Sequence, residues 1–511
     1  MGTLGDLPAA GAIVLAGHRV PFVGACEDAG LQPNKEDGSR LQTTIPPDAG
    51  RSWWLREALA DDPGEPAPPL EGDTVADVVI LGGGYTGMWT ALHLTELEPG
   101  IDVAILEQDI AGGGASGRNG GFVNSFWGDI EYLAHRFGDR AAIALCETGE
   151  ESVRAIGRFC EDQRIDAWYR ADGEYVVAAF DDQVGRWAGD VITADRLGVN
   201  EHFQVLSAAH MRERIASPVF RGALYRKVGA TVHPARLARG MRRVLLERGV
   251  RIFEDTPVTR FGAGEPALAE TPGGTVRAGT TVIGLNAWAS HWKRFRRTVV
   301  VRGSYIVLTA PAPEKLKEIG WTDGTGLADM RSAVHYVRTT PDGRISFGVG
   351  GMQPNLARRI GPRFAYDPQA IRIAVEDLHR MFPGFVDIPI QAAWGGPIDV
   401  SGHHLPTFGT IGRGNVHYGH GYTGNGVGPA HLGGRIMANR ILGKTDPVLD
   451  LPLVDLEPLR FPPEPVRSPG ALVANTAIRR KDEAEDEGEE PNPLIDFVAK
   501  LPRRLGYNLG P

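Results

Sequence analysis

The sequence predicts an α/β fold, and two stretches of the chain support this prediction. In the first, an apolar run over residues 78–81 leads into a glycine-rich turn, and a helical pattern and a second apolar run over residues 103–106 follow. In the second, strand-like runs between residues 299 and 349 are separated by turn residues such as Pro341-Asp342-Gly343. The first stretch predicts a parallel βαβ unit, and the second predicts a mostly antiparallel sheet.

The glycines of the first turn have separate roles. Gly82 suits a tight turn, Gly84 lets the backbone approach a pyrophosphate, and Gly87 lets the helix pack close to the strand. The helix N-terminus offers free N–H groups to phosphates. Glu107 lies 20 residues past Gly87, where an acidic side chain can bind a ribose. This order is that of a Rossmann-type dinucleotide site, and a βαβ unit without a ligand is the less favoured alternative. The candidate cofactor-binding residues here are Gly82, Gly84, Tyr85, Thr86, Gly87, Glu107 and Gln108.

A second glycine-rich loop bears on the choice between NAD and FAD. Residues 111–122 read AGGGASGRNGGF, so the backbone can pass close to a flat, bulky group. With this loop the sequence strongly resembles the D-amino-acid-oxidase-like flavoprotein superfamily, and the run GASGRNGG before Val123-Asn124-Ser125 looks most like gamma-glutamylputrescine oxidoreductases. The resemblance implies that the loop wraps the flavin end of FAD through Ala115, Ser116, Gly117, Arg118, Asn119, Gly120 and Gly121.

A third glycine-rich turn follows a strand-like run at residues 416–418, and a helix is expected from Val427 to Leu442. The resemblance implies that this turn aims the helix N-terminus at the pyrimidine ring of the flavin, where a helix dipole stabilises the negative charge of the reduced ring. It also implies that two segments in the middle of the chain contact the adenine and the phosphates. The candidates are Gly421, Tyr422, Gly424, Asn425, Gly426 and Val427 in the turn, and Val258, Asn286, Ala287 and Trp288 in the middle segments.

The resemblance also implies that two domains are interleaved along the chain. The Rossmann-type FAD-binding domain takes residues 74–160, 226–295 and 400–455, and an α+β substrate domain on a mostly antiparallel sheet takes residues 161–225 and 296–399. Residues 1–73 form an extension and linker, in which the aromatic run at residues 51–55 is a candidate docking segment. Residues 456–511 form a charged tail that is solvated by default, although residues 494–505 could dock as a short helix.

Bulk composition narrows the class of partner and the compartment. The 511 residues carry a net charge of −9, which argues against nucleic acid or an anionic membrane as the main partner. No apolar run approaches the ~20 residues of a membrane span. Three cysteines imply no disulfide framework, so a reducing, cytoplasmic location is expected. The adjacent His403 and His404 lack further ligands at fixed spacing, and no metal is expected.

The reaction implied by the resemblance is hydride transfer from a carbon that bears an amine to the flavin, followed by hydrolysis of the imine. An apolar pocket would lower the pKa of a substrate amine and keep it neutral, so no dedicated base is required. Members that oxidise amino acids often carry an arginine after a Trp-x-Gly, where this chain has Pro397. That departure favours an amine without an adjacent carboxylate. The candidate catalytic residues are Trp394, His335, Tyr305 and His420.

Structural roles compete with these catalytic roles. Trp394 could equally be a core aromatic residue, and a lone histidine on a strand is more often structural. Strand alternation places His335 and Tyr336 on opposite faces, so at most one of them points toward a ligand. The side chains of Arg302, Arg338 and Arg344 could bind a distal acidic group or lie on exposed strand positions.

The positions of histidine, cysteine and lysine bear on how the cofactor is attached and on which molecule accepts its electrons. Residues 111–121 contain no histidine and no cysteine follows Cys160, so FAD is expected to be non-covalent. No lysine occurs on the strand at residues 345–350, where some relatives use one to activate oxygen, so the acceptor is O₂ or another molecule. The alternatives to a gamma-glutamylputrescine-like amine are a small N-substituted amino acid or aminophosphonate, and a non-catalytic interaction protein that FAD stabilises.

Overall fold

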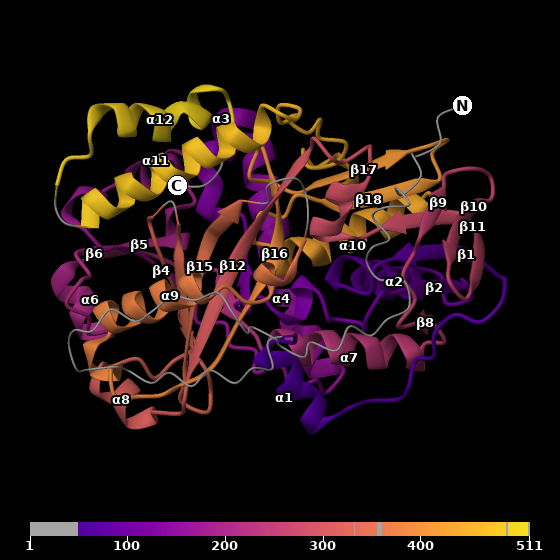
Figure 1. Ribbon diagram of the computed structural model, residues 1–511, viewed down its shortest axis with the longest axis horizontal. Helices are drawn as coiled ribbons and strands as arrows, with labels where there is room; N and C mark the ends of the chain where they lie inside the picture. Colours follow the sequence, from indigo (N-terminus) through magenta and orange to yellow (C-terminus); the bar gives the residue numbers. More distant parts are fainter. Residues whose placement is uncertain (1–49, 332, 355–359, 487–488, 509–511) are drawn as a thin grey trace, which may run out of the picture.

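The computed structural model describes residues 50–331, 333–354, 360–486 and 489–508. In this part of the chain, two eight-stranded sheets lie side by side with helices packed against them (Figure 1). The predicted α/β fold, with a parallel Rossmann-type unit and a mostly antiparallel second sheet, is confirmed. Residues 1–49, which make up most of the predicted N-terminal extension, lie outside the described residues.

The first sheet contains the βαβ unit. Its strands are β1 (Thr74–Leu81), β2 (Val103–Leu106), β8 (Arg251–Phe253), β9 (Arg260–Gly262), β10 (Ala267–Thr271), β11 (Gly274–Ile283), β17 (Thr407–Ile411) and β18 (Val416–His420). The order is β17-β18-β11-β1-β2-β8, in which β18, β11, β1, β2 and β8 run parallel and β17 runs antiparallel at one edge. The strands β10 and β9 extend from β11 as an antiparallel arm.

Both faces of β1 are buried, as expected of a parallel strand that alternates its side chains between two apolar layers. Val78 and Ile80 face a layer of helices, whereas Val79 and Leu81 face the side of the β9–β10 arm. The helical layer consists of α2 (Tyr85–Leu97), α4 (Asp139–Asp162), α7 (Pro234–Glu247) and α10 (Val427–Ile441).

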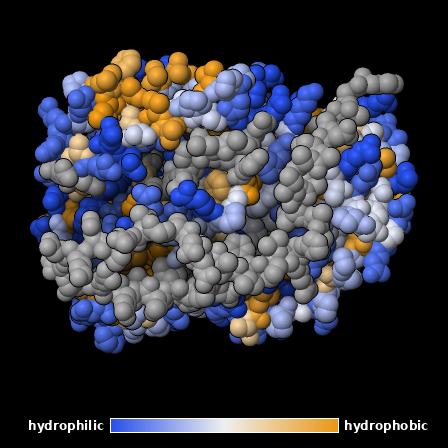
Figure 2. Space-filling model, viewed as in Figure 1, coloured by the Kyte–Doolittle hydropathy of each residue, from blue (hydrophilic) through white to orange (hydrophobic). Residues whose placement is uncertain are grey.

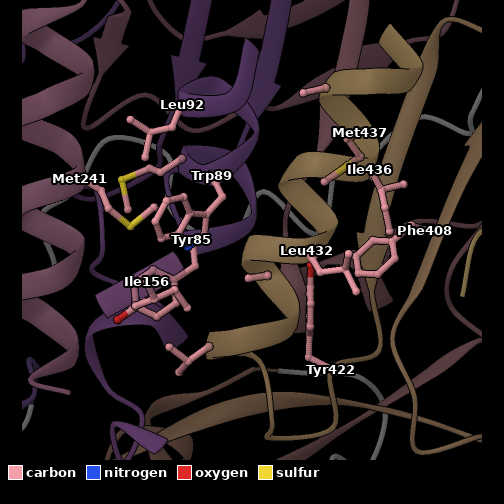
Figure 3. Packing of buried hydrophobic residues seen from close by; sticks show 14 of the residues in the cluster. Tyr85, Trp89, Leu92, Ile156, Met241, Phe408, Tyr422, Leu432, Ile436 and Met437 are labelled. Carbon is pink, nitrogen blue, oxygen red and sulfur yellow. The ribbon is translucent and has the colours of Figure 1, made fainter. Parts of the chain in front are cut away.

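The helices α2 and α10 pack against each other in the centre of this layer (Figure 3). Trp89 of α2 lies among residues of neighbouring helices, and Leu432 and Ile436 of α10 lie beside Phe408. A Cβ on Gly434 of α10 would collide with Trp89, so the helices approach as closely as they do because this position has no side chain. Since both helices begin at predicted glycine turns, their packing places the two turns near each other.

The second sheet is almost entirely antiparallel. Its order is β16-β12-β15-β14-β13-β4-β6-β5, with only β13 and β4 parallel among these pairs. A hairpin at residues 167–179, suggested by the turn residues 171–173, does not form, because residues 174–178 pair with β6 and β13 instead. The strands are β4 (Glu174–Ala178), β5 (Phe203–Ser207), β6 (Gly222–Arg226), β12 (Val299–Thr309), β13 (Gly326–Asp329), β14 (His335–Thr339), β15 (Ile345–Pro354) and β16 (Ile390–Ser401).

The two faces of the second sheet have different surroundings. Apolar side chains such as Val307 and Val337 pack against the helices α6 (Ala208–Arg214) and α9 (Pro368–Met381). Alternation turns Ser304 and Tyr336 to the opposite face. That second face lies toward the FAD-type domain and lines the main cavity of the molecule.

Other elements connect the sheets. A pattern that predicts one helix over residues 129–160 forms two, because Gly138 takes a positive φ of 84° and ends the first of them. Among the connecting elements are α3 (Ile130–Phe137), α5 (Ala188–Leu197), α8 (Pro313–Glu318), and the two-stranded ribbon of β3 (Phe122–Asn124) and β7 (Gly229–Thr231).

The segments that flank the two sheets are docked on them. The helix α1 (Trp53–Asp61) buries Trp54 against Trp394, so the predicted docking of this aromatic run is confirmed. The C-terminal segment forms α11 (Arg467–Asp486) and α12 (Pro493–Arg504), which lie across one end of the second sheet (Figure 1). The prediction of a solvated tail is therefore wrong for α11, which buries Ala477, Asp482 and Glu485.

The outer surface of α11 and α12 is apolar. Figure 2 shows a hydrophobic patch over the part of the surface where these two helices lie. Its residues include Leu472, Val473, Leu494 and Phe497, of which Leu494 is 70% exposed.

Candidate active site

One cavity of about 1910 Å³ connects the two sheets. It begins at the glycine turn after β1, passes the loop at residues 114–120 and the turn at residues 422–427, and ends against the second sheet. Ordinary small-molecule sites occupy roughly 300–1,000 Å³. This cavity is therefore large enough for a dinucleotide together with a second, smaller molecule.

The first glycine turn is shaped for close backbone approach. Gly82 has a φ of 104°, and a Cβ there would lie 2.7 Å from the carbonyl oxygen of Gly284. A Cβ on Gly87 would collide with the carbonyl oxygen of Gly82, so only glycine lets α2 start this close to β1. Gly84 lines the cavity itself, and its Cβ would lie 3.0 Å from Ser116 Oγ. The turn and the N-terminus of α2 form a cradle for a pyrophosphate.

Glu107 stands at the end of β2 and lines the same cavity. Its carboxylate accepts hydrogen bonds from the backbone N–H groups of Gly83 (2.8 Å) and Asp109 (3.0 Å). Burial nevertheless raises the pKa of Glu107 to about 7. The two N–H groups fix the carboxylate at the position where a ribose hydroxyl would meet it.

The loop at residues 115–121 is braced from within and from behind. Asn119 donates to the carbonyl oxygens of Ala115 and Ser116 and accepts from the N–H of Gly121. Arg338 of β14 donates to the carbonyl oxygens of Gly120 (2.5 Å) and Val232 (3.0 Å), and its guanidinium lies over the ring of Trp54. The loop therefore has a fixed shape before any ligand binds, which favours binding of a rigid ring.

The glycine turn at residues 421–427 is held by a buried carboxylate that the sequence analysis did not select as a candidate. Asp399, at the end of β16, accepts from the N–H of Gly421 and from the side-chain amide of Asn286 (2.9 Å). Burial raises the pKa of Asp399 to about 7. The hydroxyl of Thr86 donates to Tyr422 at 2.7 Å, which ties the turn to the N-terminus of α2. The sequence signal that could have identified Asp399 is its position, as an acid near the end of a strand that leads back to the first sheet.

Most of the cofactor-binding candidates face the cavity. Five candidates are outside its lining. Gly87, Gly117, Gly121 and Gly421 shape the surrounding backbone through close packing or turn geometry, and Ala287 is buried, with its N–H donating to Asn286 Oδ1 at 2.7 Å. The candidates in the lining are Gly82, Gly84, Tyr85, Thr86, Glu107, Gln108, Ala115, Ser116, Arg118, Asn119, Gly120, Val258, Asn286, Trp288, Tyr422, Gly424, Asn425, Gly426 and Val427.

Tyr305 and His335 lie away from the cavity, because strand alternation turns both toward the helix-covered face of the second sheet. Tyr305 donates its hydroxyl to the carbonyl oxygen of Arg363 at 2.8 Å. His335 is buried between Asp329 (2.7 Å) and Asp377 (3.1 Å). The expectation that these two side chains line the substrate pocket is not met, and both have structural partners instead.

His335 makes the free energy of unfolding depend on pH. Burial alone would lower its pKa, but Asp329 and Asp377 outweigh burial and raise the pKa to about 9 from 6.5. A raised pKa stabilises the folded state below pH 6.5, and that stability is lost as the pH rises to 9. At about 1.4 kcal/mol per pKa unit, the loss is about 3 kcal/mol. Urea unfolding of the wild type and of His335→Gln at pH 6.5 and 9 measures it. Equal pH dependence in the two proteins would contradict this role.

Trp394 and His420 also lie outside the cavity lining. The indole N–H of Trp394 donates to the carbonyl oxygen of Arg118 at 2.8 Å, and its ring packs on Trp54. Trp394 therefore supports the loop at residues 115–121 from behind. His420 is buried beside Phe295, and its Nε2 lies 3.1 Å from Thr298 Oγ1. Burial lowers the pKa of His420 to about 4, so the ring is neutral at pH 7.

The residues that do face the substrate end come from β12, β14 and β16. Tyr336 and Ser304 are 2.7 Å apart through their hydroxyl groups, and both line the cavity, so of the pair His335 and Tyr336 it is the tyrosine that faces it. Pro397 and Ile398 add an apolar wall. Arg302 also lines the cavity.

The other two arginine candidates have structural roles. Arg338 holds the loop at residues 115–121, as described above. Arg344 pairs with Asp342 at 2.7 Å, contacts Gln391, and stacks on Trp53. Neither is in the lining of the cavity, so Arg302 alone among the three is placed to meet a ligand there.

A sequence profile described as DAO, FAD dependent oxidoreductase, matches residues 77–440, which is more than half of the chain. The chain belongs to this family. DAO relatives include gamma-glutamylputrescine oxidoreductase of Escherichia coli K12, with 30% identity over 75% of this chain and 87% of the relative. A probable oxidoreductase OrdL of Haemophilus influenzae is 26% identical over 74% of this chain and 85% of the relative.

Solved structures share the fold of this chain. Glycine oxidase from Geobacillus kaustophilus gives a TM-score of 0.61 at 20% identity and covers 73% of this chain and 96% of its own. Iminodiacetate oxidase from Chelativorans sp. BNC1 gives 0.58 at 19% identity and covers 74% and 99%. At these identities the structures support the fold alone.

The cavity suits the cofactor of the DAO family. The glycine turn after β1 leaves room for a pyrophosphate, Glu107 is fixed for a ribose, and the braced loop and the Asp399-held turn enclose the space between them. The protein is an FAD-dependent oxidoreductase, and its family acts on the C–N bonds of amines and amino acids. The C-terminal helices α11 and α12 lie beyond the family match, which ends at residue 440.

The described part of the chain contains neither a candidate membrane span nor a candidate metal site. No helix there is both long enough and apolar enough to cross a membrane. No group of three or more His, Cys, Asp or Glu side chains in these residues is arranged to hold a metal ion. Cys146 and Cys160 are buried and free.

Proposed function

We propose that this DAO-family protein oxidises the C–N bond of a primary or secondary amine that resembles gamma-glutamylputrescine. When bound, FAD accepts a hydride from the carbon that bears the nitrogen. For a primary amine R–CH₂–NH₂, the products are R–CH=NH and reduced flavin, and water converts the imine to R–CHO and NH₃. The similarity to gamma-glutamylputrescine oxidoreductase supports this substrate class.

The observation that carries the proposal is the apolar wall beside the flavin-facing turn. Pro397 and Ile398 line the cavity. Family members that oxidise amino acids often carry an arginine near the place of Pro397, and Ile398 lies beside Gly424 of the flavin-facing turn. An apolar wall at this place lowers the pKa of a substrate amine, and the neutral amine is the form that loses hydride. Tyr336 and Ser304 remain as hydroxyl groups for hydrogen bonds to the substrate; burial raises the pKa of Tyr336 to about 12, so its phenol stays neutral.

The protein's own residues have three tasks in this reaction. The loop at residues 115–121 and the turn at residues 422–427 would hold the two sides of the flavin ring. The second sheet would place the substrate carbon against that ring and exclude water from it. We propose non-covalent FAD, since no histidine lies in residues 111–121 and no cysteine follows Cys160. We also propose a cytoplasmic location, on the sparse cysteine content.

A product assay tests the substrate class. With FAD-loaded protein and an artificial electron acceptor, gamma-glutamylputrescine is expected to yield one aldehyde and one ammonia for each amine consumed. Sarcosine, which carries its carboxylate on a carbon bonded to the amine nitrogen, is expected to remain intact. Turnover of sarcosine in preference to gamma-glutamylputrescine would contradict the proposal.

That outcome would favour the second candidate, oxidation of a small N-substituted amino acid or aminophosphonate. Arg302 in the cavity lining is the observation that favours it, because a guanidinium can bind a substrate carboxylate or phosphonate. The choice between the two candidates depends on how far Arg302 lies from the reacting carbon.

A further inference from the structure

Arg302 is a cation without an anionic partner. It projects from β12 into the cavity, and its charge has no carboxylate within ion-pair distance among the described residues. Its Nη2 donates to two neutral oxygens, the carbonyl of Gly351 (2.5 Å) and the side-chain Oδ1 of Asn475 (2.8 Å). Its Nε is buried without a hydrogen-bond partner. A half-buried guanidinium that lines a cavity and has only neutral partners is favourably placed to bind an anionic ligand.

The position of this guanidinium is fixed by two unusual features. Gly351 has a φ of 75°, and the pairing of β12 with β15 shifts register next to it, which turns the Gly351 carbonyl toward Arg302. Asn475 comes from α11, which lies outside the residues matched by the family profile. The C-terminal segment therefore adds a side chain that holds a cavity-facing arginine.

The guanidinium of Arg302 is hydrogen-bonded to β15, the neighbour of β12 on the side away from β16. Ile398 of β16, beside Gly424, pairs with Arg302 of β12, and Gly351 belongs to β15 on the far side of β12. Strands are spaced about 4.8 Å apart, so β15 is about 10 Å from β16. A carboxylate attached directly to the reacting carbon would stay beside Ile398, whereas a carboxylate at the end of a chain could reach Arg302.

We infer that Arg302 binds a carboxylate at the distal end of the substrate, and that Asn475 of the C-terminal helix α11 is its positioning residue. This inference deepens the proposed function and rests on it for the amine at the other end of the substrate. The substrate class is then a long amine that carries a terminal carboxylate, and the C-terminal segment takes part in selecting it.

The first experiment measures binding of a carboxylate without any reaction. Glutarate is titrated into oxidised, FAD-loaded protein while the flavin absorbance is followed, with the neutral glutaramide as the matched probe. The wild type is expected to prefer glutarate, and Arg302→Met is expected to bind glutarate about 100-fold more weakly with glutaramide binding unchanged. Equal glutarate binding by the two proteins would overturn the inference. So would equal losses for both probes, because they would show that Arg302 does not act through the charge of the carboxylate.

The role of Asn475 is tested with a charge placed opposite Arg302. Asn475→Asp supplies an internal carboxylate, so it is expected to abolish the preference for glutarate while Arg302 remains in place. Arg479→Gln, one turn further along α11 on its exposed side, is the matched control and is expected to bind both probes like the wild type. An Asn475→Asp protein that still prefers glutarate would contradict the positioning role.

Substrate kinetics then separate this inference from the proposed function. Flavin reduction by gamma-glutamylputrescine is compared with reduction by N-acetylputrescine, which lacks the carboxylate. If Arg302→Met removes the preference for gamma-glutamylputrescine, both statements are supported. If both amines reduce the flavin equally well in both proteins, the inference fails and the proposed function stands. If neither amine reduces it but glutarate binding depends on Arg302, the anion site stands and the proposed function fails.

Discussion

Replacing Gly84 by valine is expected to give a folded protein that purifies without FAD. Gly84 lines the cavity at the N-terminus of α2, and even a Cβ there would lie 3.0 Å from Ser116 Oγ. The two methyl groups that valine carries on this Cβ would occupy the space that the pyrophosphate needs. The affinity for FAD is expected to fall by more than about 100-fold, as measured by fluorescence titration of the apoprotein with FAD.

The control is a valine at a glycine without neighbours. Gly100, in the turn after α2, has nothing within 4 Å of an added Cβ and no positive φ. Gly100→Val is expected to purify with its full flavin content. A yellow Gly84→Val protein would contradict the assignment of this turn to the pyrophosphate, and a colourless Gly100→Val protein would show that the loss does not depend on the site.

Removal of the Asp399 carboxylate is expected to have the second largest effect. Asp399→Ala leaves the buried N–H of Gly421 and the amide of Asn286 without their acceptor. Each unsatisfied buried group costs about 1–3 kcal/mol, so the free energy of unfolding is expected to fall by roughly 2–6 kcal/mol. The turn at residues 421–427 loses its anchor as well, and the fraction of protein that retains FAD is expected to fall with it.

The variant Asp399→Asn separates the effect of side-chain shape at this position from the effect of its hydrogen bonds. An asparagine has the same size and keeps one acceptor oxygen, so it is expected to lose less stability than Asp399→Ala and to retain more flavin. Urea unfolding and the flavin absorbance of the purified proteins measure both quantities. If alanine and asparagine behave like the wild type, Asp399 does not hold the two segments that surround the flavin.

The sequence analysis was most successful where chemistry requires a particular backbone. The turn with Gly82, Gly84 and Gly87 could be predicted because each glycine meets a steric demand that a Cβ would violate. The acid at Glu107 and the helix that starts at Val427 followed from the same local rules. Local spacing therefore predicted the first glycine turn and Glu107, whereas the loop at residues 115–121 and the turn at residues 421–427 were implied by the family resemblance.

The substrate end was harder to predict, because its residues meet through long-range strand pairing. Tyr305 and His335 were selected by residue type, and the pairing of β12 and β14 turns them to the helix-covered face. Alternation could state that His335 and Tyr336 face opposite sides, but it could not say which side holds the cavity. The contact between Arg302 and Asn475 joins residues that are 173 positions apart, and no local pattern indicates it.

The most direct measurement is an anaerobic mixing experiment with the FAD-loaded protein. Under exclusion of oxygen, gamma-glutamylputrescine is expected to bleach the flavin absorbance band near completion, and air is expected to restore the colour at a rate that separates an oxidase from a dehydrogenase. A flavin that dithionite reduces but that no amine in a panel of mono-, di- and N-acylated amines bleaches would contradict the assignment of this protein as an amine oxidoreductase.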